Sequence, residues 1–279
     1  MINIGEYNKL KVDRKTDFGY YLVDKKNESV LLPNGSLNSN EVKVGQEIEA
    51  FIYRDSKDRP VATLKKPLIT VGEIAYLEVV GQSSFGAFAD MGLERDIFIP
   101  IKEQKFKLLK GNKYLLYAYL DKTGRLAATT RIDPYVEIGG EYKVGDEVEV
   151  ITYGKGEEKT IRVAVEGKYQ GIILGNEYYQ DIYPGTKLNV RVKRIYEDGV
   201  IGVTPRKTRL NERDDIEAKI LSYLERHGGE MIYNDKTSPE VIREVFKTSK
   251  NYFKMALGGL MKQGKIEQDT NGTRLKKYR

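Results

Sequence analysis

The sequence predicts a mainly β protein with a C-terminal α+β domain: three tandem five-stranded barrels followed by a winged helix. Two observations predict this architecture. A hairpin pattern built around a turn recurs three times along most of the 279-residue chain, and the C-terminal part changes to helical periodicity with helix-capping residues. We expect the domains to occupy residues 1–66, 67–135, 136–210 and 211–279.

The repeated hairpins occupy residues 44–64, 110–130 and 184–204. Each copy runs from a glycine through apolar residues to a polar turn and then to a second apolar run, with the same spacing in all three. In 188–193, Leu-Asn-Val-Arg-Val-Lys, apolar and polar residues alternate with the period of a half-buried strand. The repeated segments therefore predict three copies of one β unit.

A second repeated block precedes each hairpin. It is clear in residues 18–33 and 85–100 and degenerate in 160–175. With one leading strand added, each unit has five short strands, which suit a small closed or nearly closed barrel. One large β-sandwich is the alternative, but a sandwich would not predict a repeated pattern.

The C-terminal part predicts three helices followed by a hairpin, which is the order of a winged helix-turn-helix. The first helix is expected to begin at Asp214 and to end near His227, before two glycines. Ser238 before a proline and Ser249 are expected to cap the second and third helices. The hairpin is expected around the Asn-Gly pair at 271–272.

The composition excludes several classes of function. The 47 Lys and Arg residues exceed the 41 Asp and Glu residues by only six, so net charge alone does not identify the partner. No cysteine and one histidine exclude disulfides and zinc sites built from Cys and His. No secretory or membrane-spanning segment is recognisable, which favours a cytoplasmic protein. No catalytic motif occurs, and we expect no cofactor and no enzymatic activity.

The Phe-Gly-Ala-Phe sequence at 85–88, with its flanking strands, resembles the RNA-binding repeat first described in the largest small-subunit ribosomal protein. Such repeats are OB-fold five-stranded barrels. The resemblance extends to Phe-Gly-Tyr-Tyr at 18–21, whereas the third unit has no Phe-Gly pair. Three such units followed by a winged helix resemble the bacterial conserved virulence factor B family. This resemblance implies a cytoplasmic RNA-binding regulator of gene expression.

The resemblance implies that bases stack on aromatic side chains of the second and third strands. Because adjacent strand residues point to opposite faces, only one of Tyr20 and Tyr21 can face outward with Phe18. Phe85 and Phe88 share a face only if a turn or bulge lies near Gly86. The expected stacking residues are Phe18, Tyr20, Phe85 and Phe88. The alternative is that each ring fills a barrel core.

Basic residues gather in the C-terminal half, where they are expected to contact phosphates. In the third unit and just after it, these residues are Arg191, Lys193, Arg194, Arg206, Lys207 and Arg209. In the winged helix, the expected nucleic-acid contacts are Lys250, Asn251, Lys254, Arg274 and Lys276. The alternatives are charges that protect a strand edge and a winged helix that docks to protein.

We therefore expect a non-catalytic protein that binds single-stranded RNA and acts on transcript stability or translation. One alternative is a DNA-binding transcription regulator whose winged helix enters the major groove of a duplex. Another is an adaptor in a ribosomal or RNA-decay complex.

Overall fold

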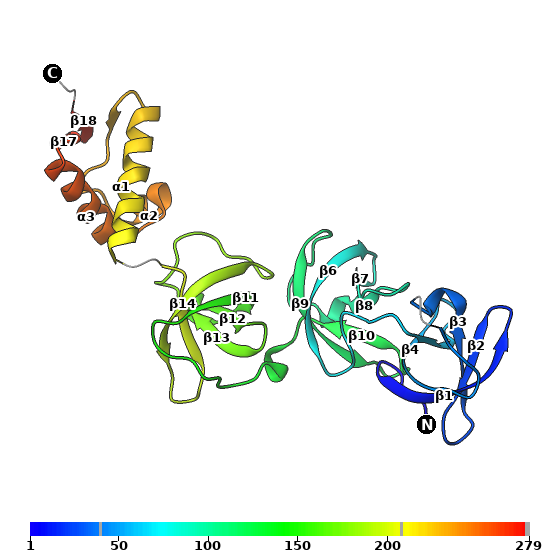
Figure 1. The fold of residues 1–279 in the computed structure, drawn as a ribbon. Coiled ribbons are helices and arrows are strands. Elements are labelled where there is room, and N and C mark those ends of the chain that lie inside the picture. Colours follow the sequence, from blue (N-terminus) through cyan, green and yellow to red (C-terminus); the bar gives the residue numbers. More distant parts are fainter. Residues whose placement is uncertain (39–40, 207–208, 277–279) are drawn as a thin grey trace.

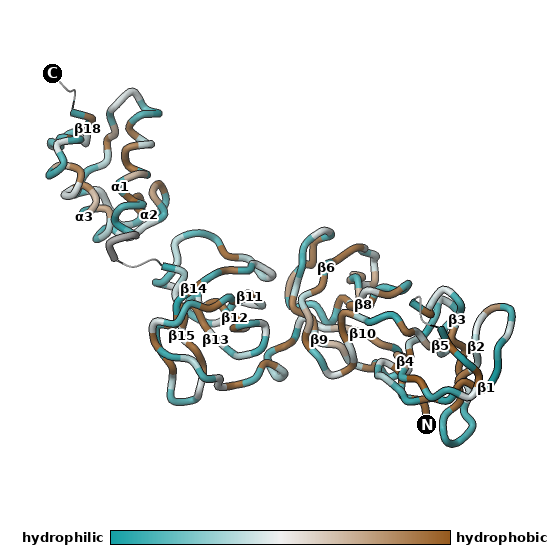
Figure 2. The backbone as a smooth tube through the Cα atoms, viewed as in Figure 1, coloured by the Kyte–Doolittle hydropathy of each residue, from teal (hydrophilic) through white to brown (hydrophobic). Residues whose placement is uncertain are grey.

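The computed structural model describes residues 1–38, 41–206 and 209–276, with the backbone alone described at 209–211. The three barrels lie in a row, and the winged helix lies at the far end from the N-terminus (Figure 1). Hydrophobic residues concentrate on the barrel strands and on the helices, while the connecting loops are mainly hydrophilic (Figure 2). The expected fold class is confirmed.

Each barrel closes from five strands in the same topological order, in which the third and fifth strands are parallel and the other described pairs are antiparallel. The first contains β1 (Tyr7–Thr16), β2 (Gly19–Val23), β3 (Ser29–Pro33), β4 (Glu47–Arg54) and β5 (Pro60–Thr63). The second contains β6 (Ile74–Gln82), β7 (Gly86–Ala89), β8 (Ile97–Pro100), β9 (Lys113–Leu120) and β10 (Leu126–Thr129). The third contains β11 (Glu147–Lys155), β12 (Ile161–Val165), β13 (Tyr169–Ile173), β14 (Lys187–Ile195) and β15 (Ile201–Thr204).

The Phe-Gly glycines permit close strand pairing at the start of β2 and β7. A Cβ atom on Gly86 would lie 2.3 Å from the carbonyl oxygen of Ile99, and one on Gly19 would lie 2.1 Å from that of Leu32. Only glycine fits such an approach. The preceding phenylalanine of each pair lies in the turn before the strand and not in the strand itself.

The C-terminal domain has the expected order of three helices and a wing. It contains α1 (Arg209–Arg226), β16 (Glu230–Met231), α2 (Pro239–Phe246), α3 (Lys250–Lys262), β17 (Ile266–Gln268) and β18 (Thr273–Leu275). The hydroxyls of Ser238 and Ser249 accept hydrogen bonds from backbone amides in the first turns of α2 and α3, as expected. The expected start of the first helix at Asp214 is wrong, because helix-forming residues continue the helix upstream to Arg209.

The first and second barrels share one hydrophobic core. Phe51 and Val61 of the first barrel pack in the same buried cluster as the interior of the second. The guanidinium of Arg125 donates two hydrogen bonds to the carboxylate of Asp58, both at 2.9 Å, and Arg54 donates to the carbonyl of Gly124. This combination of buried area and paired donors makes the two barrels a continuous unit.

The second and third barrels meet through a smaller buried cluster around Ile132 and Tyr153. At its edge, the carboxylate of Asp133 binds both Lys105 and Arg162. Burial works to raise the pKa of Asp133, but these two hydrogen bonds outweigh it and hold the pKa below its ordinary value. The ionised carboxylate therefore stabilises this junction.

Replacing Asp133 with Asn is expected to lower the free energy of unfolding by about 1–2 kcal/mol at neutral pH, since two charge-assisted hydrogen bonds weaken. A lowered folded-state pKa contributes stability above the ordinary aspartate pKa, and that contribution disappears as the pH falls through the folded-state value. Denaturant titrations at neutral and acidic pH measure this difference. Asp17→Asn, at an exposed turn, is the control; an equal, pH-independent loss in both variants would contradict the expectation.

No helix in the described part of the chain is long and apolar enough to cross a membrane. Among the same residues, no group of three or more His, Cys, Asp or Glu side chains is arranged to hold a metal ion.

Candidate nucleic-acid interface

Three phenylalanines form an aromatic face on the second barrel. Phe85 lies in the turn before β7 with 77% of its surface exposed. Phe88 on β7 is directly opposite Phe98 on β8, and the two ring centroids are 5.2 Å apart. The turn before Gly86 brings Phe85 to the same face as Phe88 despite their opposite parity in the sequence. The expected need for a turn at this position is confirmed.

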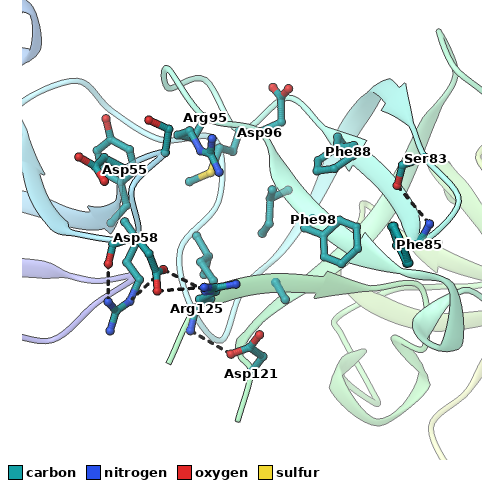
Figure 3. Close-up of a pocket in the computed structure, with 17 residues that line it drawn as sticks. Asp55, Asp58, Ser83, Phe85, Phe88, Arg95, Asp96, Phe98, Asp121 and Arg125 are labelled. Carbon is teal, nitrogen blue, oxygen red and sulfur yellow. Dashed lines mark hydrogen bonds and ion pairs between the residues drawn. The ribbon is translucent and has the colours of Figure 1, made fainter. Parts of the chain in front are cut away.

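A cavity of about 440 Å³ extends from this aromatic face to the first barrel. Figure 3 shows the three phenylalanines on one side and Asp55 and Asp58 of the first barrel on the other. Its volume falls within the range of roughly 300–1,000 Å³ that is typical of ligand pockets. The cavity is therefore a composite of two barrels and offers stacking surface beside charged groups.

The first barrel presents Phe18 and Tyr21 at the corresponding positions. Phe18 is 69% exposed, and the guanidinium of Arg14 lies 4.2 Å from the centroid of the Tyr21 ring. The expected outward position of Tyr20 is wrong, because Tyr20 is 9% exposed and belongs to the barrel core. Phe18 precedes the strand, so strand alternation does not relate its direction to that of Tyr20.

Strand register identifies the counterparts of these residues in the third barrel. A bulge in the leading strand places Gly81 opposite Phe88 and, in the third barrel, Gly154 opposite Arg162. Arg162 and Lys159 thus take the positions of Phe88 and Phe85. Arg162 is held by Asp133, so the third barrel has neither the aromatic pair nor a free side chain at the second position.

The basic residues of β14 differ in their surroundings. The amino group of Lys193 lies 2.5 Å from the carboxylate of Glu177. Burial of Glu177 raises its pKa, but hydrogen bonds from Lys193 and Thr204 outweigh burial and lower it below the ordinary value. Arg194 lies over the ring of Tyr196. Arg191 makes no side-chain hydrogen bond or ion pair within residues 1–38, 41–206 and 212–276, which leaves it available for phosphate.

Arg206 connects the third barrel to the winged helix. Its guanidinium makes three hydrogen bonds of 3.1–3.2 Å to Glu212 and lies 4.7 Å from the ring centroid of Tyr252. A carboxylate at the start of α1 thus already binds Arg206, which reduces the positive charge that this residue can offer to a phosphate. Lys207 and the side chain of Arg209 lie outside the described residues.

The winged helix exposes only part of its expected basic surface. Asn251 and Lys254 are exposed on α3, and Lys276 is exposed after β18. The amino group of Lys250 donates to a backbone carbonyl 3.4 Å away. Arg274 on the wing pairs with Glu267 at 2.5 Å and Asp269 at 3.5 Å. These pairs reduce the positive charge that the wing presents to a phosphate backbone.

Several residues of the site escaped the sequence analysis. Tyr21, Phe98, Arg95 and Asp96 are not among the contact residues expected from the sequence. The available signal was the alignment of the two Phe-Gly blocks, because strand register makes Tyr21 the counterpart of Phe88. No sequence signal placed Asp58 at the cavity, because Asp58 belongs to the neighbouring barrel.

Protein-family models match most of the chain. The S1 domain model matches residues 4–65 and 71–131, and the CvfB-like winged helix domain model matches 218–275. The barrels, the exposed aromatic face and these matches define a multidomain protein made of nucleic-acid-binding domains.

Relatives similar along nearly the whole chain identify the family. Uncharacterized protein YitL of Bacillus subtilis is 30% identical, and the match covers 98% of this chain and 94% of that protein. Conserved virulence factor B of Staphylococcus epidermidis is 28% identical, with 88% of each chain covered. The chain belongs to the conserved virulence factor B family. The crystal structure of a multidomain protein with nucleic acid binding domains from Streptococcus pneumoniae matches with a TM-score of 0.55 and 25% identity, covering 98% of this chain and 99% of that chain.

Proposed function

We propose that this protein binds single-stranded RNA and thereby regulates transcript stability or translation, without catalysing a reaction. The observation that carries this proposal is the exposed ring of Phe85 beside the Phe88–Phe98 pair at the inter-barrel cavity. The match of the two N-terminal barrels to the S1 domain model supports nucleic-acid binding.

Exposed aromatic rings support single-stranded ligands in particular. In a duplex the faces of the bases are stacked on one another, whereas an unpaired base can leave the stack and lie on a protein ring. Phe18 and Phe85 expose most of their surface to solvent, and a base stacked on either ring would remove that apolar surface from water. Each barrel of the N-terminal pair thus offers one platform for a base.

Duplex DNA binding by the winged helix is the second candidate, and the exposed Asn251 and Lys254 on α3 favour it. The pairing of Arg274 with two carboxylates weakens it, because the wing then has less positive charge for the DNA backbone. An adaptor role in a ribosomal or RNA-decay complex is a third candidate.

Competition binding separates these candidates. The labelled ligand is single-stranded RNA, and the competitors are unlabelled single-stranded RNA, single-stranded DNA and duplex DNA of the same sequence. We expect single-stranded RNA to compete best. Stronger competition by the duplex would favour the DNA regulator, and absence of binding to every nucleic acid at physiological salt would favour the adaptor.

Affinity for single-stranded RNA is expected to fall as salt rises, because basic side chains release counterions from phosphates. Lys254→Ala should reduce the slope of log affinity against log salt by about 0.7, as expected for one lost phosphate contact on a single strand. Arg274→Ala is the matched control, since its charge is already paired on the wing. Equal reductions in slope for both variants would contradict this assignment, and titration over a salt series measures it.

A further inference from the structure

Two neighbouring charged side chains lie at the inter-barrel cavity and interact electrostatically with each other. Arg95 and Asp96 lie in the loop before β8 and line the cavity, and neither makes a hydrogen bond or ion pair with another residue in the described ranges. In the view of Figure 3 they lie between Asp55 of the first barrel and the phenylalanine rings. The pKa of Asp96 is raised by partial burial and then by the charge of Asp90. Asp96 is an exposed acceptor at the rim of the cavity, beside an aromatic surface.

The other charged groups of the cavity already have partners. Asp58 binds Arg125, Asp55 binds Arg59, and Asp121 accepts hydrogen bonds from its own turn. Arg54 donates to carbonyl oxygens. The lining carboxylates of Asp55, Asp58, Asp96 and Asp121 are balanced by the guanidinium groups of Arg54, Arg95 and Arg125 together with Arg59, which binds Asp55. The cavity therefore has no net positive charge to attract a phosphate, and it suits an uncharged base that donates hydrogen bonds.

We propose that this cavity binds a guanine base of single-stranded RNA and that Asp96 and Arg95 select it. The proposal rests on the proposed function. The base stacks on the Phe88–Phe98 pair, Asp96 accepts hydrogen bonds from N1–H and the N2 amine, and Arg95 donates to O6 and N7. A free carboxylate next to a free guanidinium matches this arrangement of donors and acceptors.

Other bases satisfy the two side chains less well. Adenine has an amine donor at C6, where guanine has a carbonyl acceptor, and uracil and cytosine offer no pair of adjacent donors to a carboxylate. Such bases lose the direct contacts that guanine makes with the two side chains, and a good bidentate contact is worth about 1–3 kcal/mol of discrimination between bases. Guanine is accordingly the base that leaves neither Asp96 nor Arg95 without a partner.

The selective pair occurs in the second barrel and not in the first. Strand register makes Glu28 and Ser29 the counterparts of Arg95 and Asp96. Glu28 accepts a hydrogen bond from the backbone amide of Ile2 at 2.9 Å, so it is already engaged. Phe18 of the first barrel therefore offers stacking without this selection, and base preference should depend on the second barrel.

Binding of the full-length protein to oligouridines of roughly 12 nucleotides, a length that spans one or more barrels, tests the proposal. The oligonucleotides carry uridine, adenosine, guanosine or inosine at one central position. We expect the guanosine ligand to bind about tenfold more tightly than the uridine and adenosine ligands. Inosine lacks the N2 amine, so the inosine ligand should bind the native protein more weakly than the guanosine ligand does.

Asp96→Asn should remove the preference for guanosine over inosine, so that the guanosine ligand binds no more tightly than the inosine ligand. Glu78→Gln removes the same charge from an exposed position of the same barrel outside the cavity and should keep the preference. Equal affinity of the native protein for all four ligands, or an unchanged preference in Asp96→Asn, would overturn the assignment. Absence of binding to every oligonucleotide would instead contradict the proposed RNA-binding function itself.

Discussion

Replacing Phe85 with alanine is expected to weaken binding of single-stranded RNA by about 1–3 kcal/mol, which is the usual cost of losing one stacked base. The ring is 77% exposed, so its removal takes little from the barrel core. Exposed substitutions of this kind change the free energy of unfolding by about 0.5 kcal/mol or less. The expected result is therefore a loss of affinity without a loss of stability, measured by RNA titration and by thermal unfolding of the same preparations.

Leu109 supplies the matched control for this experiment. It is an exposed apolar residue of the same barrel, 48% exposed, and does not line the cavity. Leu109→Ala should leave both affinity and stability unchanged. If Phe85→Ala lowers the unfolding temperature and keeps full affinity, Phe85 is a structural residue and the stacking assignment is wrong.

Tyr20→Ala and Tyr21→Ala are expected to have opposite effects although the two residues are neighbours. Tyr20 is buried among Leu22 and Leu32, and truncation of a buried aromatic side chain costs roughly 3 kcal/mol of stability. Tyr21 is half-buried and carries the guanidinium of Arg14 over its ring. Its loss should weaken RNA binding by about 1 kcal/mol or more, with a much smaller change in stability.

Chemical denaturation and RNA titration of both variants measure this contrast. Tyr20→Phe is the additional control, because it keeps the buried ring and should keep most of the stability. If Tyr21→Ala destabilises the first barrel as much as Tyr20→Ala does, the outward assignment of Tyr21 is incorrect. If Tyr20→Ala weakens RNA binding at unchanged stability, the original selection of Tyr20 as the stacking residue is restored.

The junctions between domains explain why these experiments use the full chain. Val136 and Ile151 are buried together between the second and third barrels, and Asp133 binds side chains from both sides. Division of the chain near residue 135 would expose this cluster. Weaker RNA binding by a fragment could then result either from lost RNA contacts or from lost stability. Single substitutions in the full chain distinguish the two causes.

The order of domains could be predicted from the sequence because it depends on local patterns. Strand alternation, turn glycines and the serine caps at 238 and 249 are encoded within a few residues of each element. For Phe18 and Phe85 the sequence left stacking and core positions open, and the structure places both rings on the surface, in the turns before the two glycines.

Whether an individual side chain is buried, exposed or paired with another charge depends on the tertiary structure. Tyr20 and Tyr21 have the same type and adjacent positions, and strand register alone determines which of them enters the core. Arg206 resembles Arg191 in the sequence, but Glu212 neutralises the former. The cavity beside Phe85 also needs Asp58 from another barrel. Strand register, charge pairing and packing between barrels depend on residues that are far apart in the chain. A local sequence pattern therefore does not predict them.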